Sequence, residues 1–473
     1  MQSTRRTSNA IGVIAAIVTF ALVGCSQESN PRVDGVVERT MWRLGLPSVS
    51  ISVVVDGRLA YVKAYGNATV ATRYEIGSVT KQFTAASLLL LQQDGKLRLD
   101  DPVSKYLPAL AGSRQITIRE LLDHTSGYTD YYATLSNTAI FNDTSLERLV
   151  RNFTSEGLDF QPGTQWSYSN TGYAVLTEIV ERVARMRYGS FLQSRIFGPL
   201  HMTSAIYLAK PSFGQATAIG YDRVLLGPEA PAKPEGRDWL NGAAGIAMTA
   251  RDLGIWNAAL LNGTLLNADS TKEMFTDQRL RSGGPTGYGL GVFVVHLSNA
   301  TIVSHTGEVQ GFTAANALIL EKRFGVAVLC DQENSPAPGY LSGAIAGAFG
   351  MFPRSPDSPA GSIRIPPDTN GPGDVQVSRE LQRLVHRLAL STLRSSDFTP
   401  DEAAIASPER LRHLGIELTR LGAPVTFEAA ERHSRGRYTV SSVVVRFRNN
   451  RELKVTMAKD QAGKIADLFV YEQ

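Results

Sequence analysis

Hydrophobic and polar positions near the start of the chain repeat first with a helical period and then with a strand-like one. Residues 33–44 carry apolar side chains at helical spacing and are followed by Gly45, a residue type that commonly ends helices. Two apolar runs come next, at 48–55 and 58–65, and the Asp-Gly pair between them is a two-residue hairpin signal. The pattern predicts a helix followed by an antiparallel hairpin.

A second group of strand-like runs lies much further along the chain. Four runs are joined by short polar turns: 290–297, 301–304, 311–320 and 324–329. Strands joined in this way form a meander, so we expect an antiparallel sheet. Helical patterns at 79–93 and 172–184 separate the two groups of strands. The predicted fold class is therefore α/β, with sequence-distant strands in one antiparallel sheet flanked by helices.

The stretch 353–374 separates two parts of the chain. It carries six prolines mixed with Ser, Gly and Asp and has no apolar periodicity, as is typical of a linker. After it, apolar residues recur at helical spacing around 381–393, and strand-like runs follow at 438–447, 453–457 and 465–471. We therefore expect a large domain, 25–352, and a small α+β domain, 375–473. A curved sheet over a helix, similar to cystatin-like or nuclear-transport-factor-like modules, is the expected form of the small domain.

The N-terminal segment resembles an export signal. Two arginines precede an apolar run at 11–23, which at 13 residues is shorter than the ~20 needed to span a bilayer. The run ends in a Leu-Val-Gly-Cys sequence that resembles the lipobox of bacterial lipoproteins. That resemblance implies removal of residues 1–24 and lipidation of Cys25, and an ordinary cleaved signal is the alternative. We expect attachment to the cell envelope through the lipid alone, at the periplasmic face of the outer membrane in a double-membraned bacterium.

Composition and charge narrow the classes of function. The 473 residues are 43% hydrophobic and 19% charged, as is typical of a folded soluble protein. The net charge of +4 falls to +2 without Arg5 and Arg6, so nucleic acid is not an expected partner. Once Cys25 is lipidated, Cys330 is the remaining cysteine, so no internal disulfide can form. Because Cys330 ends the apolar stretch 326–329, we expect a small buried hydrophobic residue there.

Several chemistries lack their sequence signatures. The seven histidines include no pair at i, i+4, and there is no Cys-x-x-Cys, so we expect no metal site. Neither a Gly-x-Ser-x-Gly elbow nor a phosphate-binding Gly-x-x-x-x-Gly-Lys motif is present. The glycine-rich segment 287–291 runs directly into a strand-like stretch, not a helix, so it is not expected to bind a nucleotide. No cofactor is expected.

Ser78 and Lys81 are candidates for a nucleophile and its base. Ser78 precedes a helix-like run that is apolar nearly all round, which predicts the N-terminus of a buried helix, where free N–H groups favour developing negative charge. Their spacing of three places Lys81 one turn later on the same face, within hydrogen-bonding reach of the serine oxygen. Burial lowers the proton affinity of a lysine, which can then accept the hydroxyl proton. Roughly one or two Ser-x-x-Lys matches arise by chance in such a chain, so the alternative is a helix N-cap followed by a solvated lysine.

Two further groups of polar residues support the nucleophile. Tyr-Ser-Asn at 168–170 follows a turn and precedes a helical pattern. The Tyr168 phenol can relay a proton, and the Asn170 amide can hold both the lysine and a substrate carbonyl. His-Thr-Gly at 305–307 lies at the edge of the predicted sheet, where the glycine lets a substrate lie against the strand. His305 and Thr306 can there bind a carboxylate or an oxygen of the acyl donor.

In this order the three motifs resemble those of the serine penicillin-recognising family, which comprises penicillin-binding proteins, D-alanyl-D-alanine carboxypeptidases, class C β-lactamases and related esterases. The resemblance covers roughly residues 32–350 and includes longer signatures at 121–128, 160–163 and 245–253. It implies a β-lactamase/transpeptidase-like fold with a helical subdomain. The roles that it implies are Ser78 as acylated nucleophile, Lys81 as base, Tyr168 as proton relay, Asn170 as the residue that orients the substrate amide, and the N–H groups of Ser78 and Glu308 as the oxyanion hole.

Two departures from the family's patterns bear on activity. His305 stands where many β-lactamases carry lysine, and an imidazole is largely neutral at pH 7, so it holds a substrate carboxylate less firmly. The histidine version resembles D-alanyl-D-alanine peptidases and esterases, so efficient β-lactam hydrolysis is not expected. The second motif is Tyr-Ser-Asn instead of Ser-Asp-Asn, and no equivalent of the class A glutamate is visible, which disfavours a class A β-lactamase.

The sequence therefore predicts an exported serine hydrolase that works through a Ser78 acyl-enzyme. Its expected substrates are D-amino-acid peptides of the cell wall, as for a D-alanyl-D-alanine carboxypeptidase, with peptidoglycan as a candidate partner. The alternatives are an esterase on small esters or amides and a non-catalytic penicillin-binding lipoprotein. Intact Ser78, Lys81 and Tyr168 count against the last, because a binding protein has no need of an activated nucleophile.

Overall fold

The computed structural model describes residues 30–134, 139–155, 157–208, 218–222, 230–352, 375–399, 408–435, 438–448 and 451–472. The expected signal peptide with Cys25 and the expected linker at 353–374 lie outside these residues. No helix within the described ranges is both long enough and apolar enough to cross a bilayer.

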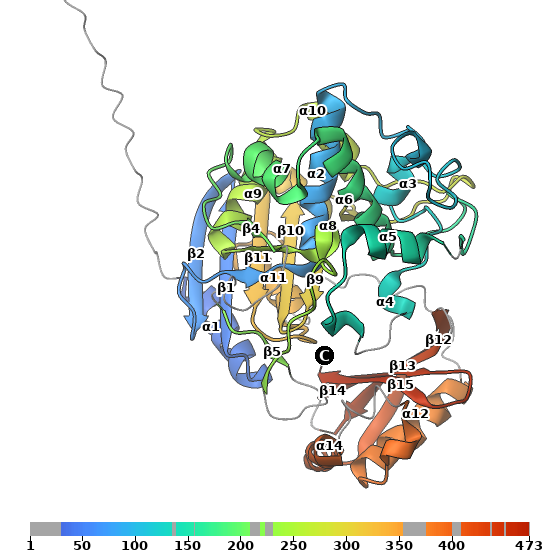
Figure 1. The fold of residues 1–473 in the computed structure, drawn as a ribbon. Coiled ribbons are helices and arrows are strands. Elements are labelled where there is room, and N and C mark those ends of the chain that lie inside the picture. The colour runs from blue at the N-terminus through green and yellow to red at the C-terminus, as the bar shows by residue number, and fades with distance from the viewer. Residues whose placement is uncertain are drawn as a thin grey trace, which may run out of the picture.

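A six-stranded antiparallel sheet forms the centre of the large domain (Figure 1). Its order is β2-β1-β11-β10-β9-β8. The strands are β1 Ser48–Val55, β2 Arg58–Gly66, β8 Phe293–Leu297, β9 Ala300–Val309, β10 Phe312–Ile319 and β11 Phe324–Cys330. The predicted hairpin and the predicted meander are both present, and they join where β1 pairs with β11, with Val49 opposite Cys330. The prediction of one antiparallel sheet built from sequence-distant strands is confirmed.

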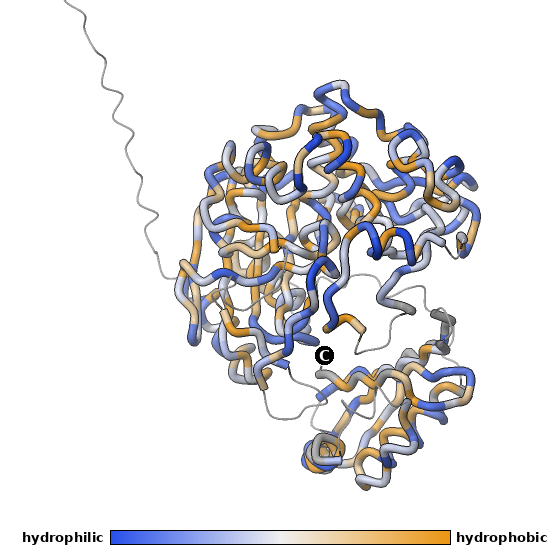
Figure 2. Tube along the Cα trace, viewed as in Figure 1, coloured by the Kyte–Doolittle hydropathy of each residue, from blue (hydrophilic) through white to orange (hydrophobic). Residues whose placement is uncertain are grey.

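Helices cover both faces of this sheet, and they explain why β10 and β11 at its centre are buried along their whole length. Along β11, Val326 and Val328 pack into a core with α1 and α11, whereas Ala327 and Leu329 pack into the larger core with α2 and α9. The helices are α1 Pro31–Leu44, α2 Thr80–Gln93, α3 Ile118–Leu122, α4 Tyr131–Thr134, α5 Leu146–Thr154, α6 Asn170–Ala184, α7 Tyr188–Leu192, α8 Asn241–Ala244, α9 Ala250–Asn262, α10 Ala268–Phe275 and α11 Ala337–Ala348. Figure 2 shows hydrophobic residues along the central strands and hydrophilic residues on many outer loops.

Helix α2 lies at the centre of the large domain and carries the candidate lysine. From Thr80 to Leu91 every residue of α2 is buried, because the helix is surrounded by other helices and the sheet. Phe83 stacks on Trp256 of α9, with ring centroids 4.2 Å apart. Ser78 lies just before α2, in the 3-10 turn Gly77–Val79. The prediction that Ser78 lies at the N-terminus of a buried helix is therefore confirmed to within one turn.

Short strands hold the chain on either side of this turn. β3 Tyr74–Glu75 pairs with β7 Ile246–Met248, which also pairs with β4 Ile206–Tyr207. β5 Tyr221–Asp222 pairs with β6 Ala230–Pro231. The Ile76 amide donates a further hydrogen bond of 3.0 Å to the Ile246 carbonyl oxygen. The segment before Ser78 is thus fixed to a second small sheet, independently of the main one.

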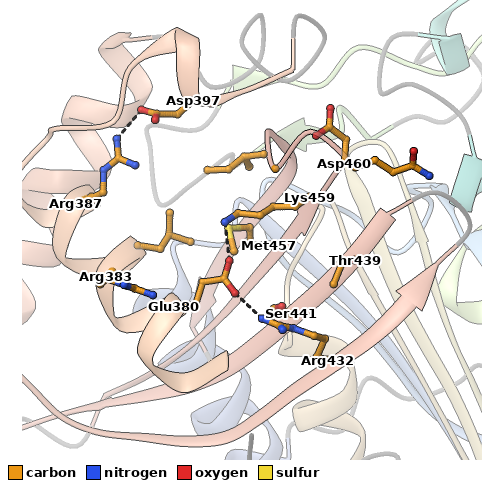
Figure 3. Close-up of a pocket in the computed structure, with 14 residues that line it drawn as sticks. Glu380, Arg383, Arg387, Asp397, Arg432, Thr439, Ser441, Met457, Lys459 and Asp460 are labelled. Carbon is orange, nitrogen blue, oxygen red and sulfur yellow. Dashed lines mark hydrogen bonds and ion pairs between the residues drawn. The ribbon is translucent and has the colours of Figure 1, made fainter. Parts of the chain in front are cut away.

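The C-terminal residues have a hydrophobic core of their own and form an α+β unit. Its strands follow the order β12-β13-β14-β15. The elements are α12 Val375–Ala389, α14 Pro408–Leu421, β12 Pro424–Arg435, β13 Tyr438–Phe447, β14 Glu452–Lys459 and β15 Ile465–Glu472. The sequence pattern predicted one helix and three strands, and it missed α14 and β12. Glu380 of α12 accepts hydrogen bonds of 2.6 Å from both Lys459 and Arg432, beside a cavity of about 650 Å³ between helix and sheet (Figure 3).

Candidate active site

The Lys81 amine joins the first two motifs. Lys81 is fully buried, and its Nζ lies 3.1 Å from Ser78 Oγ, 2.7 Å from Asn170 Oδ1 and 3.0 Å from the carbonyl oxygen of Ala243. A neutral amine has two N–H donors and one lone pair. With the donors directed at the Asn170 and Ala243 oxygens, the lone pair is left for the hydroxyl proton of Ser78. The contacts therefore fit the predicted role of Lys81 as an acceptor for the Ser78 proton.

Burial allows Lys81 to be neutral near physiological pH. Loss of solvation lowers the pKa of Lys81 to about 7, although the nearby Asp130 carboxylate acts in the opposite direction. A base whose pKa lies close to the working pH is in the deprotonated form often enough to act, and is still strong enough to accept a proton. The pKa and the geometry thus point to the same role.

Asp130 fixes the orientation of the Asn170 amide. The Asn170 Nδ2 and backbone N–H groups donate to Asp130 Oδ1 at 3.1 and 3.2 Å. Because Nδ2 is held by a carboxylate, the amide oxygen must point toward Lys81. Asn170, predicted to orient a substrate amide, therefore uses both ends of its own amide within the protein. Sequence reasoning missed Asp130, although it follows the 121–128 signature by only two residues.

Tyr168 lies against the amine and the serine. The Lys81 Nζ is 4.7 Å from the centroid of the Tyr168 ring. Burial raises the pKa of the Tyr168 phenol far above its ordinary value, although a hydrogen bond with Ser78 acts in the opposite direction. The phenol is therefore protonated at neutral pH and can give a proton to a leaving group. The structure brings Ser78, Lys81, Tyr168 and Asn170 together, as the sequence motifs predicted.

His124 supports the loop that carries Tyr168. Its Nδ1 accepts a 3.1 Å hydrogen bond from the Ser169 amide, and its ring lies against the Tyr168 ring at a centroid distance of 4.3 Å. Burial lowers the pKa of His124 well below its ordinary value. A neutral, fully packed imidazole of this kind acts as a structural hydrogen-bonding group.

The backbone of the Ser78 turn lies directly against strand β9. A Cβ on Gly307 would lie 1.9 Å from the Ile76 carbonyl oxygen, and one on Gly77 would lie 2.4 Å from the Glu308 amide nitrogen. Gly77 also has a φ of +51°, which other residues rarely adopt. Two glycines thus allow the amides of Ser78 and Glu308 to approach each other, as an oxyanion hole built from these two groups requires.

The third motif lies within β9, on the part of the strand that β8 leaves uncovered. β8 pairs with residues 300–304 of β9, so residues 305–309 have β10 on one side and the cleft on the other. The sequence predicted a strand that ends at residue 304. In the structure the strand continues to Val309, because residues 305–309 also pair with β10. Thr306 is exposed on this open edge, as expected for a residue that contacts a substrate.

Both ring nitrogens of His305 are engaged by the protein. Its Nδ1 contacts the carbonyl oxygen of Thr306, so Nδ1 carries the proton, and its Nε2 accepts a 3.0 Å hydrogen bond from the Tyr288 hydroxyl. Burial lowers the pKa of His305 to about 3, so the imidazole is neutral through the physiological range. Its predicted contact with substrate stays a prediction, and the observed bonds give it the task of positioning β9. Sequence reasoning missed Tyr288, which belongs to the glycine-rich segment set aside there.

These groups lie along a cleft of about 850 Å³. Ser78, Tyr168, Asn170 and Thr306 line it, together with carboxylate side chains and Thr456 of β14. Cys330 lies elsewhere, buried in the sheet, as predicted. The described residues contain no group of three or more His, Cys, Asp or Glu side chains placed to hold a metal ion. The cleft thus brings together a serine, a phenol and an amide, with the Lys81 amine behind them and carboxyl groups along its wall.

Comparisons with known proteins agree with this geometry. A family model described as Beta-lactamase matches residues 33–347. The protein flp of Staphylococcus aureus (strain N315) is 27% identical over 329 residues, which are 66% of this chain and 65% of the relative, so the match spans just under two thirds of that protein. The putative penicillin-binding protein PbpX of Bacillus subtilis is 29% identical over 62% of this chain and 73% of its own.

Solved structures extend the comparison to the fold. A D-stereospecific amidohydrolase from Streptomyces sp. superposes with a TM-score of 0.59 at 26% identity, covering 69% of this chain and all of its own (100%). An octameric penicillin-binding protein homologue from Pyrococcus abyssi superposes with a TM-score of 0.60 at 20% identity, covering 93% of this chain and 98% of its own. The β-lactamase/transpeptidase-like fold expected from the motifs is thereby confirmed.

Proposed function

The chain belongs to the Beta-lactamase family of serine hydrolases, and we propose that it hydrolyses amides and peptides of D-amino acids through a Ser78 acyl-enzyme. One observation carries the proposal: the Lys81 amine holds Ser78 Oγ and Asn170 Oδ1 at once, inside a cleft lined by Tyr168. An activated nucleophile of this kind has a purpose only in acyl transfer. From the N-terminal sequence we also propose that the enzyme is exported and lipid-anchored through Cys25.

Acylation follows from the contacts of these groups. Ser78 Oγ attacks the carbonyl carbon of the substrate and forms the new C–O bond, while its proton passes to the lone pair of Lys81. The carbonyl oxygen becomes an oxyanion between the N–H groups of Ser78 and Glu308; such donors are worth ~3 kcal/mol each. The C–N bond then breaks, and the Tyr168 phenol gives its proton to the departing amine. Lys81 returns a proton to Tyr168.

Deacylation uses the same groups in reverse. A water molecule gives its proton to the Tyr168 and Lys81 pair as its oxygen attacks the acyl carbon. The ester bond to Ser78 Oγ breaks, and the proton returns to that oxygen. The products are the free acid and the regenerated serine. No other residue is required for proton transfer, because the amine has a pKa of about 7 and the phenol stays protonated.

The substrate class rests on relatives and on the lining of the cleft. The Streptomyces neighbour is titled a D-stereospecific amidohydrolase, and it is similar over all of its own length. A carboxypeptidase, the activity expected from the motifs, needs a group that binds a terminal carboxylate. No lysine or arginine is present among the described residues that line the cleft, and His305 is neutral. The bond cleaved is therefore proposed to be an amide or peptide bond of a D-amino acid, without recognition of a terminal carboxylate.

Hydrolysis of small esters is the second candidate, because an ester requires the same nucleophile, base and oxyanion hole. The neutral His305 is compatible with it, since a small ester has no carboxylate to bind. His305→Ala should lower both activities, because His305 positions β9 for either substrate, so the two candidates are separated by substrate preference.

Hydrolysis of D-alanine p-nitroanilide, its L enantiomer and p-nitrophenyl acetate tests the proposal. We expect Ser78-dependent hydrolysis of the D-anilide in preference to the L-anilide, and a loss of at least ~1,000-fold in Ser78→Ala. Ser155→Ala is the matched control, since Ser155 is exposed and bonds only to a backbone carbonyl in its own helix. Turnover of the ester alone would replace the amidase proposal by the esterase one. Equal rates in wild type and Ser78→Ala would reject both.

A further inference from the structure

The wall of the cleft is acidic beyond what the catalytic groups require. Four of the described residues that line it are carboxylic acids, and none is a lysine or arginine: Asp130, Glu235, Glu308 and Glu333. Two of the four interact with other side chains of the protein. Asp130 holds the Asn170 amide, and Glu333 is hydrogen-bonded to the carboxyl of Asp222, which together with burial raises the pKa of Glu333. Glu235 and Glu308 remain.

Glu308 presents a carboxyl group on the open edge of β9, where desolvation by the walls of the cleft raises its pKa. Its side chain is exposed, and Oε1 accepts a 2.7 Å hydrogen bond from the Asn334 amide. The backbone N–H of Glu308 is also one of the two groups assigned to the oxyanion hole. A group bound by this carboxylate would therefore belong to the part of the substrate next to the reacting carbonyl.

Glu235 supplies a buried carboxyl oxygen with no donor, and burial raises the pKa of Glu235 to about 7. The residue is 4% exposed, and Oε1 accepts a 3.0 Å hydrogen bond from the amide of Gln310, just beyond the end of β9. Within the described structure, Glu235 Oε2 is buried without any hydrogen-bond partner. A buried carboxylate oxygen left in this state is costly, so such atoms commonly mark a missing ligand.

A third carboxyl lies behind Glu235. Glu75, three residues before Ser78, is 2% exposed, and its Oε2 also lacks a partner among the described residues. Burial and the neighbouring charge of Glu235 raise the pKa of Glu75. A cation beside Glu235 would offset the repulsion between the two carboxyls. A compact organic cation with several N–H donors would supply the missing donor to Glu235 Oε2 and would favour the charged form of this carboxyl.

From these contacts we propose that the substrate carries an ammonium group, which the carboxylates of Glu308 and Glu235 bind beside the reacting carbonyl. The inference rests on the proposed function, since the ammonium must belong to the acyl donor of the Ser78 reaction. Two sources share this chemistry: a free α-amine, as in a D-amino acid amide, and a side-chain amine, as in a lysine-type residue. The enzyme would then select substrates by a positive charge and not by a terminal carboxylate.

Binding to the full chain carrying Ser78→Ala, measured by titration calorimetry, tests the inference without turnover. The probes are D-alaninamide, N-acetyl-D-alaninamide and N-acetyl-D-lysinamide. We expect one of the two amine-bearing probes to bind at least ~10-fold more tightly than N-acetyl-D-alaninamide, which corresponds to about 1.4 kcal/mol. Tighter binding of D-alaninamide identifies the α-amine as the source, and tighter binding of the lysine derivative identifies the side chain.

Substitutions then assign the preference to the two carboxylates. Glu308→Gln and Glu235→Gln keep an acceptor for the amides of Asn334 and Gln310 but remove the charge. Each should lower the affinity for the preferred amine-bearing probe, divided by the affinity for N-acetyl-D-alaninamide, by ~10-fold or more. Glu147→Gln, a change at an exposed glutamate paired with Arg151, is the control and should leave the ratio unchanged.

Three results would overturn the inference. The first is that neither amine-bearing probe binds more tightly than N-acetyl-D-alaninamide. The second is that the two glutamine variants lose the same affinity for the preferred amine-bearing probe as for N-acetyl-D-alaninamide. The third is that none of the three probes binds. The proposed function is judged separately, because Ser78-dependent hydrolysis of p-nitrophenyl acetate by the wild type involves no charged substrate. Loss of the ammonium preference with that hydrolysis intact would reject only the inference.

Discussion

At the scale of single residues, the account depends on what burial does to Lys81 and Tyr168. The same loss of solvation lowers the pKa of the amine to about 7 and raises that of the phenol. The two shifts make the amine a base and keep the phenol an acid at the same pH. These two groups can then take up the proton of Ser78, pass a proton between them and give one to the leaving amine, which covers the proton transfers of the proposed acylation.

The pKa of Lys81 predicts the pH dependence of acylation. The amine must be neutral to accept the serine proton, so the acylation rate should rise about tenfold per pH unit below the pKa of about 7 and level off above it. Asp130 raises the pKa of Lys81, so Asp130→Asn should move this limb to lower pH. Asp100→Asn, at an exposed carboxylate paired with Arg119, is the control. A pH-independent rate between pH 5 and 9 would contradict the assignment.

The sequence pointed to the residues that react, and it missed several that position them. Ser78, Lys81, Tyr168 and Asn170 belong to short motifs with fixed spacing, so they could be found without a structure. Asp130, Tyr288 and Glu235 come from separate loops and meet the site only through tertiary contacts. No local pattern distinguishes such residues from ordinary loop residues, and only the folded chain shows which polar atoms they serve.

At the scale of elements, the site depends on the close approach of β9 and the turn before α2. The Gly307 backbone leaves no room for a side chain against the Ile76 carbonyl oxygen. The two elements come from different parts of the chain and belong to different sheets. The geometry of the oxyanion hole is therefore set by how well these elements pack.

Gly307→Ala should separate the two elements. Its Cβ would lie 1.9 Å from the Ile76 oxygen, so either the turn or β9 must move, and both oxyanion donors lose their alignment. We expect the acylation rate to fall by ~100-fold or more, together with a lower melting temperature. Gly347→Ala in α11 is the matched control, because nothing lies within 4 Å of its added Cβ. Wild-type acylation by Gly307→Ala would show that the proposed oxyanion hole is wrong.

The elements that were predicted correctly are those with strong local patterns. The hairpin of β1 and β2 has apolar strands and an Asp-Gly turn, and the meander has apolar runs between short turns. β12 was missed because it mixes charged and apolar residues without alternation. α14 was missed because its apolar positions are separated by charged residues and a glycine, and it is held in place by packing against α12. Tertiary packing, which the local pattern does not contain, supports both.

At the scale of the whole molecule, the described chain contains separate hydrophobic cores on the two sides of the expected linker. The cores of the large domain draw their members from residues 33–346, and the C-terminal core draws its members from 377–470. No buried hydrophobic residue belongs to both among the residues described. The domain boundary stays a prediction, and the separate cores indicate how to test it.

Scanning calorimetry of the full chain should show two unfolding transitions. An acyl group on Ser78 makes non-covalent contacts with the cleft only when the large domain is folded, so acylation should raise the melting temperature of one transition and leave the other in place. For domains of 150 residues or more the shift is roughly 2–4 °C per kcal/mol of stabilisation. A single transition, or equal shifts of both, would contradict two independently folded domains.

The claim that most of this account depends on is acylation of Ser78, and intact-mass spectrometry tests it most directly. The fragment from residue 26 would be incubated with a fluorescent penicillin and, separately, with p-nitrophenyl acetate, beside Ser78→Ala. The account predicts a mass increase of one acyl group in the wild type with at least one of these reagents, mapped to the peptide that contains Ser78 and absent from Ser78→Ala. No adduct on the wild type with either reagent, or the same adduct on the variant, would contradict the assignment of Ser78 as the nucleophile.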